Sequence, residues 1–245
     1  MTRFGSVIVA TALTAVLWPS PAGAQGMENT RSFTLALGTG LALGGNVISE
    51  GVGRINGTPT VFVEQAYGNH FSDALRVRLM GNVGLDYNKE AFATFAYNKM
   101  NATERVTGSV GGYPLYTRFE NTAAIDIEGG VRYYLRPEGP TRTYVAGVAG
   151  LRFHEEVNAT IRVLEVGLSL NNLPYYERST LFLVGADTGV SRDLSDTIAI
   201  GAEIGLRYQP KPSPARILEG TGLEDINDTG SRWSLPISAF LTWRF

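Results

Sequence analysis

The chain has 245 residues, 21 Lys+Arg against 23 Asp+Glu, a formal net charge of −2, two histidines and no cysteine. The absence of a basic excess argues against a nucleic-acid-binding protein. Without cysteine there is neither a disulfide framework nor a lipid anchor on cysteine, and a structural zinc site is not expected. No cofactor is indicated.

The first 24 residues have the features of a secretory signal peptide. Arg3 is their only charge, an apolar run of about twelve residues follows, and Ala22-Gly23-Ala24 offers small residues for cleavage before Gln25. A membrane helix would need an apolar run of roughly 20 residues. We therefore expect residues 1–24 to be removed and residues 25–245 to form one exported domain.

Eight segments of this domain have the length and the alternation of strands that cross a bilayer. In chain order they are Arg31–Leu43, Thr60–Phe71, Ala74–Tyr87, Ala124–Leu135, Thr143–Phe153, Thr180–Ser191, Thr197–Tyr208 and Trp233–Phe245. Ala74–Tyr87 has leucine and valine at most odd positions and Arg76 and Arg78 at even ones. Thr60–Phe71 is apolar on both faces in places, and Val61, Val63 and Tyr67 are assigned to its outward face.

The connections between these segments alternate in length. Ser72-Asp73, 136–140 and 192–195 read as tight turns, whereas 44–59, 88–123, 154–179 and 209–231 are long, with the proline-rich start of the last fitting an exposed loop. No segment after the signal peptide is long enough for a membrane helix, and a membrane protein without such helices must be a closed barrel. The alternation is typical of short periplasmic turns and long extracellular loops.

The sequence therefore predicts an all-β fold, an eight-stranded antiparallel transmembrane β-barrel in the bacterial outer membrane. Segment 88–123 leaves one alternative open, since Ala91–Tyr97 with a later partner would give ten strands. Eight is favoured because no tight turn divides that segment. Aromatic residues gather at the strand ends, as in the belts at a lipid–water interface.

Four stretches resemble the small outer-membrane barrel superfamily that includes the OmpA transmembrane domain and the neisserial opacity proteins. They are Tyr67–Arg78, Gly130–Leu135 with Thr143–Gly150, Gly189–Asp196 and Leu241–Phe245. The resemblance implies that Leu241, Trp243 and Phe245 form a signal for the barrel-assembly machinery. It also implies contact with outer-membrane lipid and lipopolysaccharide, and long loops that present an unidentified extracellular ligand site.

The inward faces are expected to carry a charge network in the barrel lumen, with six acids and six bases. The acids are Glu64, Asp86, Asp126, Glu128, Asp187 and Glu203, and the bases are Arg76, Arg78, Arg132, Arg152, Arg207 and Arg244. An eight-stranded barrel is just wide enough for its side chains to fill. The network is therefore either a polar plug, which we favour, or the lining of a narrow, porin-like ion path.

One motif suggests an enzyme. His70-Phe71-Ser72-Asp73 is similar to the His-x-Ser core of outer-membrane lipid A deacylases, with His70 as base and Ser72 as nucleophile. The predicted topology places it at a periplasmic turn, away from lipid A, and no acid completes a triad. We therefore expect no catalytic residue and a structural, surface-interaction role, with a narrow channel as the alternative and a lipid-modifying enzyme as a third reading.

Overall fold

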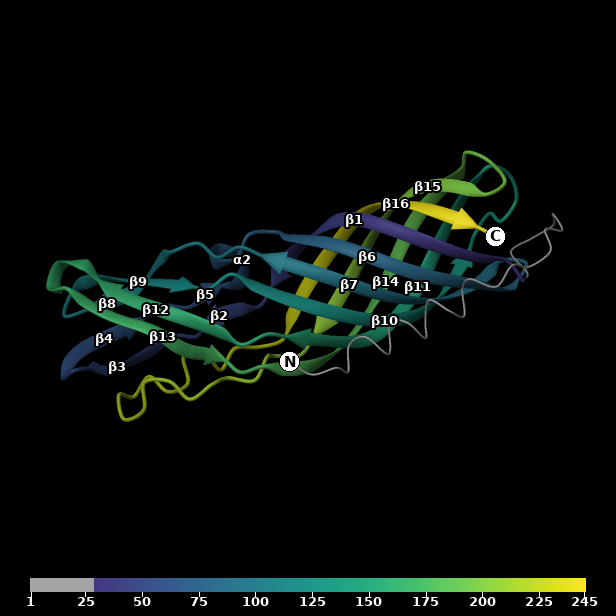
Figure 1. The fold of residues 1–245 in the computed structure, drawn as a ribbon. Helices are drawn as coiled ribbons and strands as arrows, with labels where there is room; N and C mark the ends of the chain where they lie inside the picture. The colour runs from purple at the N-terminus through teal and green to yellow at the C-terminus, as the bar shows by residue number, and fades with distance from the viewer. Residues whose placement is uncertain (1–28) are drawn as a thin grey trace.

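The computed structural model describes residues 29–245 (Figure 1). The expected signal peptide lies outside the described residues. Across residues 29–245, no helix has both the length and the apolar character needed to span a membrane.

Eight strands form a closed antiparallel barrel, so the predicted fold class is confirmed. Around the barrel, each strand pairs with the next and β1 pairs with β16, from Ser32 opposite Arg244 to Gly44 opposite Trp233. Its strands are β1 (Arg31–Gly44), β6 (Ala74–Asp86), β7 (Lys89–Met100), β10 (Thr122–Tyr134), β11 (Thr141–His154), β14 (Ser179–Asp193), β15 (Ile198–Gln209) and β16 (Arg232–Arg244).

The alternation of side chains gives the barrel two chemically different faces. In β6, Arg76, Arg78 and Asn82 point inward and are at most 4% exposed, whereas Leu75 on the outer face is 59% exposed. The outward facings expected for β11 and β14 are confirmed, for example at Phe182, which is 55% exposed. The barrel thus reverses the usual arrangement of a globular protein, with a polar interior and an apolar outside.

Two assignments made from the sequence are wrong. One predicted barrel strand is not in the barrel and one barrel strand was assigned to a loop, so the predicted number of eight strands is still correct. Thr60–Phe71 is not a barrel strand. It contains most of β4 (Thr58–Phe62), the short β5 (Gln65–Ala66) and the single turn α2 (Tyr67–His70). The missing barrel strand is β7, in the segment assigned to a loop, so the barrel has eight strands and the ten-strand alternative is also wrong.

The alternation in β7 is hidden by its composition. Phe92 and Ala96 point inward beside Glu90 and Asn98, and outward positions include small alanines, so neither face looks purely polar or apolar. The turn before it has only two residues, Tyr87 and Asn88, between Asp86 and its partner Lys89. Ser72-Asp73 consequently lies at the end of the barrel with the long connections, not at a short turn.

The long connections form a second sheet that continues the barrel at one end (Figure 1). Its order is β13-β12-β9-β8-β4-β3, and a two-stranded pair of β2 and β5 accompanies it. The further bounds are β2 (Asn46–Ile48), β3 (Gly51–Ile55), β8 (Arg105–Val110), β9 (Tyr113–Phe119), β12 (Val157–Val163), η1 (Leu164–Val166) and β13 (Leu168–Tyr176). We call these elements, with α2 and residues 210–231, the distal module.

The distal module has its own apolar core, which includes Phe62, Phe71, Leu115, Phe119 and Tyr175. Residues 210–231, expected to be an exposed loop, contribute to that core and act as a strap across the sheet. The strap buries Ile217, Leu223 and Ile226, each at most 2% exposed.

Backbone bonds hold the strap to both edge strands of the sheet. Arg54 N of β3 donates to Thr221 O, and Ala215 N of the strap donates to Tyr175 O of β13. Packing there is tight, because a Cβ added at Gly53 would lie 2.2 Å from Thr221 O. The sequence does not indicate this packing, because the apolar residues of the strap follow no regular spacing.

Candidate functional site

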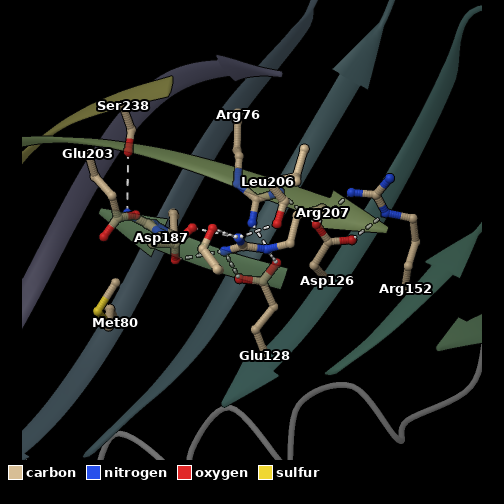
Figure 2. A network of polar contacts seen from close by, with 12 residues as sticks. Arg76, Met80, Asp126, Glu128, Arg152, Asp187, Glu203, Leu206, Arg207 and Ser238 are labelled. Carbon is tan, nitrogen blue, oxygen red and sulfur yellow. Dashed lines mark hydrogen bonds and ion pairs between the residues drawn. The ribbon is translucent and has the colours of Figure 1, made fainter. Parts of the chain in front are cut away.

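The barrel lumen contains a network of ion pairs in two groups, of which Figure 2 shows mainly the first. At its centre, the guanidinium of Arg76 on β6 donates to Asp126 Oδ2 at 2.7 Å and to Glu128 Oε1 at 2.8 Å, both on β10. The sequence predicts that these two strands are neighbours, but β7 lies between them. Arg76 reaches past β7, where Asn98 Oδ1 also accepts from it at 3.0 Å.

Two arginines hold carboxylates with one edge of the guanidinium group. The Nε and Nη2 atoms of Arg152 donate to the two oxygens of Asp126 at 2.7 and 2.9 Å. The same atoms of Arg207 lie 3.3 Å from the two oxygens of Glu128, and Arg207 also donates to Asp187 at 2.5 and 2.9 Å. Such two-pronged contacts fix orientation as well as charge.

The second group lies toward the short turns. Arg78 pairs with Glu203 at 2.6 Å, and Arg132 pairs with Glu90 at 2.7 Å. The hydroxyl groups of Tyr134 and Tyr144 donate to Glu90 and Glu203, at 2.9 and 2.7 Å. The guanidinium of Arg132 lies 4.3 Å from the ring centre of Tyr144.

A small cavity lies among these side chains. It is near the turn end, between Glu90, Arg132, Tyr144 and Phe240, and has a volume of about 10 Å³, so it holds one water molecule at most. Asp126 and Glu128 are at most 2% exposed. Charges buried this deeply are tolerated only when they are paired and hydrogen-bonded, and here they are.

Two residues assigned to the lumen lie elsewhere, and a third, Arg244, lines the turn end of the lumen. Glu64 is exposed between β4 and β5 in the distal module, because its segment is not a barrel strand. Asp86 lies at the β6–β7 turn, where it pairs with Lys89 on the surface. Arg244 sits at the turn end of the barrel and pairs with Asp193 at 2.5 Å.

Glu90 is a lumen residue that sequence reasoning missed. It belongs to β7, and the error in that strand removed it from consideration. The signal that would have found it is the inward set of β7, in which Glu90, Thr94 and Asn98 recur at every fourth position.

The His70-Ser72 motif does not form a catalytic pair. The ring of His70 is buried edge-on against Phe119, and no side chain accepts from or donates to its nitrogens. Burial lowers the pKa of His70 to about 4. Ser72 Oγ instead accepts from Asn101 N at 3.3 Å. The topological argument against the motif was wrong, since it lies at the end with the long connections, but the geometry gives the serine no base.

The remaining site assignments concern metals and assembly. Residues 29–245 contain no group of three or more histidines and acids that could hold a metal ion. Leu241 and Trp243 lie on the outer face of β16, Phe245 directly follows the strand, and the ring of Trp243 stacks on Phe33 of β1 with 6.4 Å between centroids. Their role as an assembly signal stays a prediction.

Comparison with known proteins gives structural matches only. No family model and no curated protein matches the chain. Neisserial surface protein A matches with 12% identity and a TM-score of 0.47, covering 88% of this chain and 96% of its own. The outer membrane protein OprG from Pseudomonas aeruginosa matches with 9% identity and a TM-score of 0.46, covering 91% and 99%.

A major outer membrane protein from Thermus thermophilus matches with 11% identity and a TM-score of 0.43, covering 88% of this chain and 99% of its own. These matches come from the class of proteins that the sequence resembles. At such low identities a likeness concerns the fold alone, and the barrel follows here from the strand pairing itself. The chain is an eight-stranded antiparallel barrel with a charged interior and an ordered distal module.

Proposed function

We propose that this chain is a bacterial outer-membrane protein whose barrel anchors the distal module at the cell surface, where the module binds an extracellular partner. The outer face of the barrel supports the membrane assignment. On β16, Trp233 and Trp243 are ten residues apart, about 33 Å along a strand. At a tilt of about 40° this is a height of about 25 Å, the height of the apolar band of an outer-membrane barrel.

The observation that carries the functional choice is the ion pairing across the lumen. Ion pairs link β6, β10, β11, β14 and β15 across the interior. An ion that crosses the lumen would have to disrupt these pairs, and the cavity at the turn end has room for one water molecule. This favours an anchor over a channel.

The distal module supplies the binding surface. Its core and its strap hold the connections in one conformation, so the module presents a fixed surface rather than mobile loops. Apolar side chains stand exposed on that surface, including Val52 at 69%, Leu164 at 63%, Val166 at 56% and Val106 at 50%. Val52 of β3 lies directly opposite Val61 of β4, which is 37% exposed, and an exposed apolar patch on an ordered surface is typical of a protein interaction site.

Single-channel recording in planar bilayers tests the closed lumen. We expect negligible conductance from the wild-type barrel and a measurable conductance from Glu128→Ala, which removes a partner of both Arg76 and Arg207. Asp86→Ala is the matched control, because it removes an exposed carboxylate and should stay closed. A steady, ion-selective wild-type conductance, with a selectivity that Glu128→Ala alters, would establish the channel instead.

A further inference from the structure

Arg232 is a buried cation without a carboxylate partner. It is the first residue of β16 and points inward where the barrel meets the distal module, with 4% of its surface exposed. Its guanidinium carbon lies 4.0 Å from the ring centre of Tyr67 and 5.2 Å from that of Tyr176. Among residues 29–245, its Nε and Nη2 atoms have no acceptor within hydrogen-bond distance, and the hydroxyl groups of Tyr67 and Tyr176 interact with the guanidinium group electrostatically.

These two nitrogens define the kind of ligand that the group would take. Nε and Nη2 form one edge of the guanidinium group, the edge by which Arg152 holds both oxygens of Asp126 in the same lumen. Arg207 presents the same edge to Glu128. On Arg232 this edge fits a group with two adjacent oxygens, such as a carboxylate or a phosphate.

The charge balance of the interior points the same way. Among the charged side chains of the lumen that are at most 12% exposed, six guanidinium groups face five carboxylates. The guanidinium groups belong to Arg76, Arg78, Arg132, Arg152, Arg207 and Arg232, and the carboxylates to Glu90, Asp126, Glu128, Asp187 and Glu203. All five acids are engaged by arginines other than Arg232. Arginine does not lose its proton in proteins, so one buried positive charge has no counter-charge. The tyrosine rings attract the cation but do not neutralise it.

Two further polar groups without partners lie at the ends of β11 and β14. His154, the last residue of β11, interacts electrostatically with Arg232, and its Nε2 atom is buried without a hydrogen-bond partner. Ser179 lies directly opposite His154 on β14, and its hydroxyl group also lacks a partner. Asp126, a carboxylate that also acts on His154, is already held by Arg76 and Arg152.

We propose that Arg232, with His154 in its electrostatic reach, binds a small oxyanion at the junction of the barrel and the distal module. The bound group presents two oxygens to Nε and Nη2 of Arg232 and carries a single negative charge at this point, which balances the interior. The site goes beyond the proposed anchoring role, because it exists whether or not the lumen conducts and whichever partner the module binds.

Equilibrium dialysis with radiolabelled inorganic phosphate tests the site in the refolded protein in detergent micelles, at constant ionic strength. We expect saturable binding of one phosphate per chain. Acetate, which has two adjacent oxygens, should displace it, whereas an equal concentration of chloride, which has no oxygen, should not. Arg232→Lys keeps the charge but loses the two-pronged edge, so its affinity should fall at least tenfold. Arg216→Lys is the matched control, since the Arg216 side chain is 91% exposed, and should bind like the wild type.

The source of the oxyanion is distinguished by competition. Lipopolysaccharide that displaces the label identifies a lipid phosphate, and lipopolysaccharide without effect identifies a free ion. Where Arg232→Lys does not fold, the ¹⁵Nε resonance of Arg232 in the wild type replaces it as the readout and should shift as phosphate is added. Absence of saturable wild-type binding, equal binding by a folded Arg232→Lys, or an unmoved resonance would overturn the proposal and leave Arg232 as a stacked, hydrated cation.

Discussion

Replacing Asp126 by alanine should destabilise the barrel more than any other single loss of a carboxylate. Asp126 is 0% exposed and accepts four hydrogen bonds, one from Arg76, two from Arg152 and one from Asn98. Its removal leaves two buried cations with reduced compensation. Breaking a buried ion pair from one side costs about 3–5 kcal/mol. Arg76 retains Glu128 and Arg152 retains Gln209, so we expect a loss in the free energy of unfolding of about 3 kcal/mol, near the lower limit.

Reversible urea unfolding in lipid vesicles, followed by tryptophan fluorescence, measures this loss. Asp86→Ala is the control, because Asp86 and Lys89 form an exposed surface pair, which water and salt screen. Asp126→Asn separates charge from hydrogen bonding, since the amide keeps one acceptor, and should fall between the wild type and the alanine variant. Equal stability of the Asp126→Ala and Asp86→Ala proteins would refute the view that the ion pairs in the lumen stabilise the folded barrel.

Four further predictions follow from the same structure. An arginine in place of Leu79, on the outer face, should cost about 2–4 kcal/mol if it lies near the bilayer midplane, whereas Leu85→Arg near the turn end should cost about 0–1 kcal/mol; equal urea midpoints for the two variants would contradict the membrane position. Deleting Phe245 should lower the amount of heat-modifiable, folded barrel in the membrane, and an unchanged amount would remove the assembly signal. Gly53→Ala should expose the strap to limited proteolysis, because its Cβ collides with Thr221 O, while Gly147→Ala, which meets nothing within 4 Å, should leave it resistant. The pKa of His70 is about 4 in the folded protein and 6.5 in the unfolded chain, so the stability of the distal module is fully present above pH 6.5 and falls as the pH drops toward 4. Protection of the distal module from proteolysis should weaken over this pH range. The weakening should be smaller in His70→Phe, which cannot take up a proton.

The fold could be predicted from the sequence because barrel strands repeat a simple pattern. β10 and β16 place apolar residues at every second position over their whole length, so their existence, bounds and facing follow from the residues alone. β7 could not be found in this way, since Phe92 points inward among polar neighbours. Thr58–Phe62 shows the opposite failure, because a strand in the distal module has the same two-residue period as one in the barrel.

The site was predictable only in part, because alternation identifies inward residues but not their partners. The meeting of Arg76 with Asp126 follows from their shared inward facing, although the strand between them was missed. Glu90 was lost with β7, and Asp86 was misplaced because alternation does not show where a strand leaves the barrel. The burial of the strap depends on contacts between distant parts of the chain, such as Tyr175 Oη with Ile226 O, for which no local pattern exists.

The strap also sets an order of events during folding. It connects β15 to β16, so it is positioned only when β16 has joined β1 and the barrel has closed. The groups that it bonds come from the first and third long connections, and the hydroxyl group of Tyr175 reaches Val47 O across 128 residues of chain. Contacts between such distant residues form late, because the loops between them must close first. The distal module is therefore completed after the barrel, and a chain that stalls before its last strand inserts would present an unfinished, apolar module. A completed distal module therefore indicates that β16 has joined the barrel.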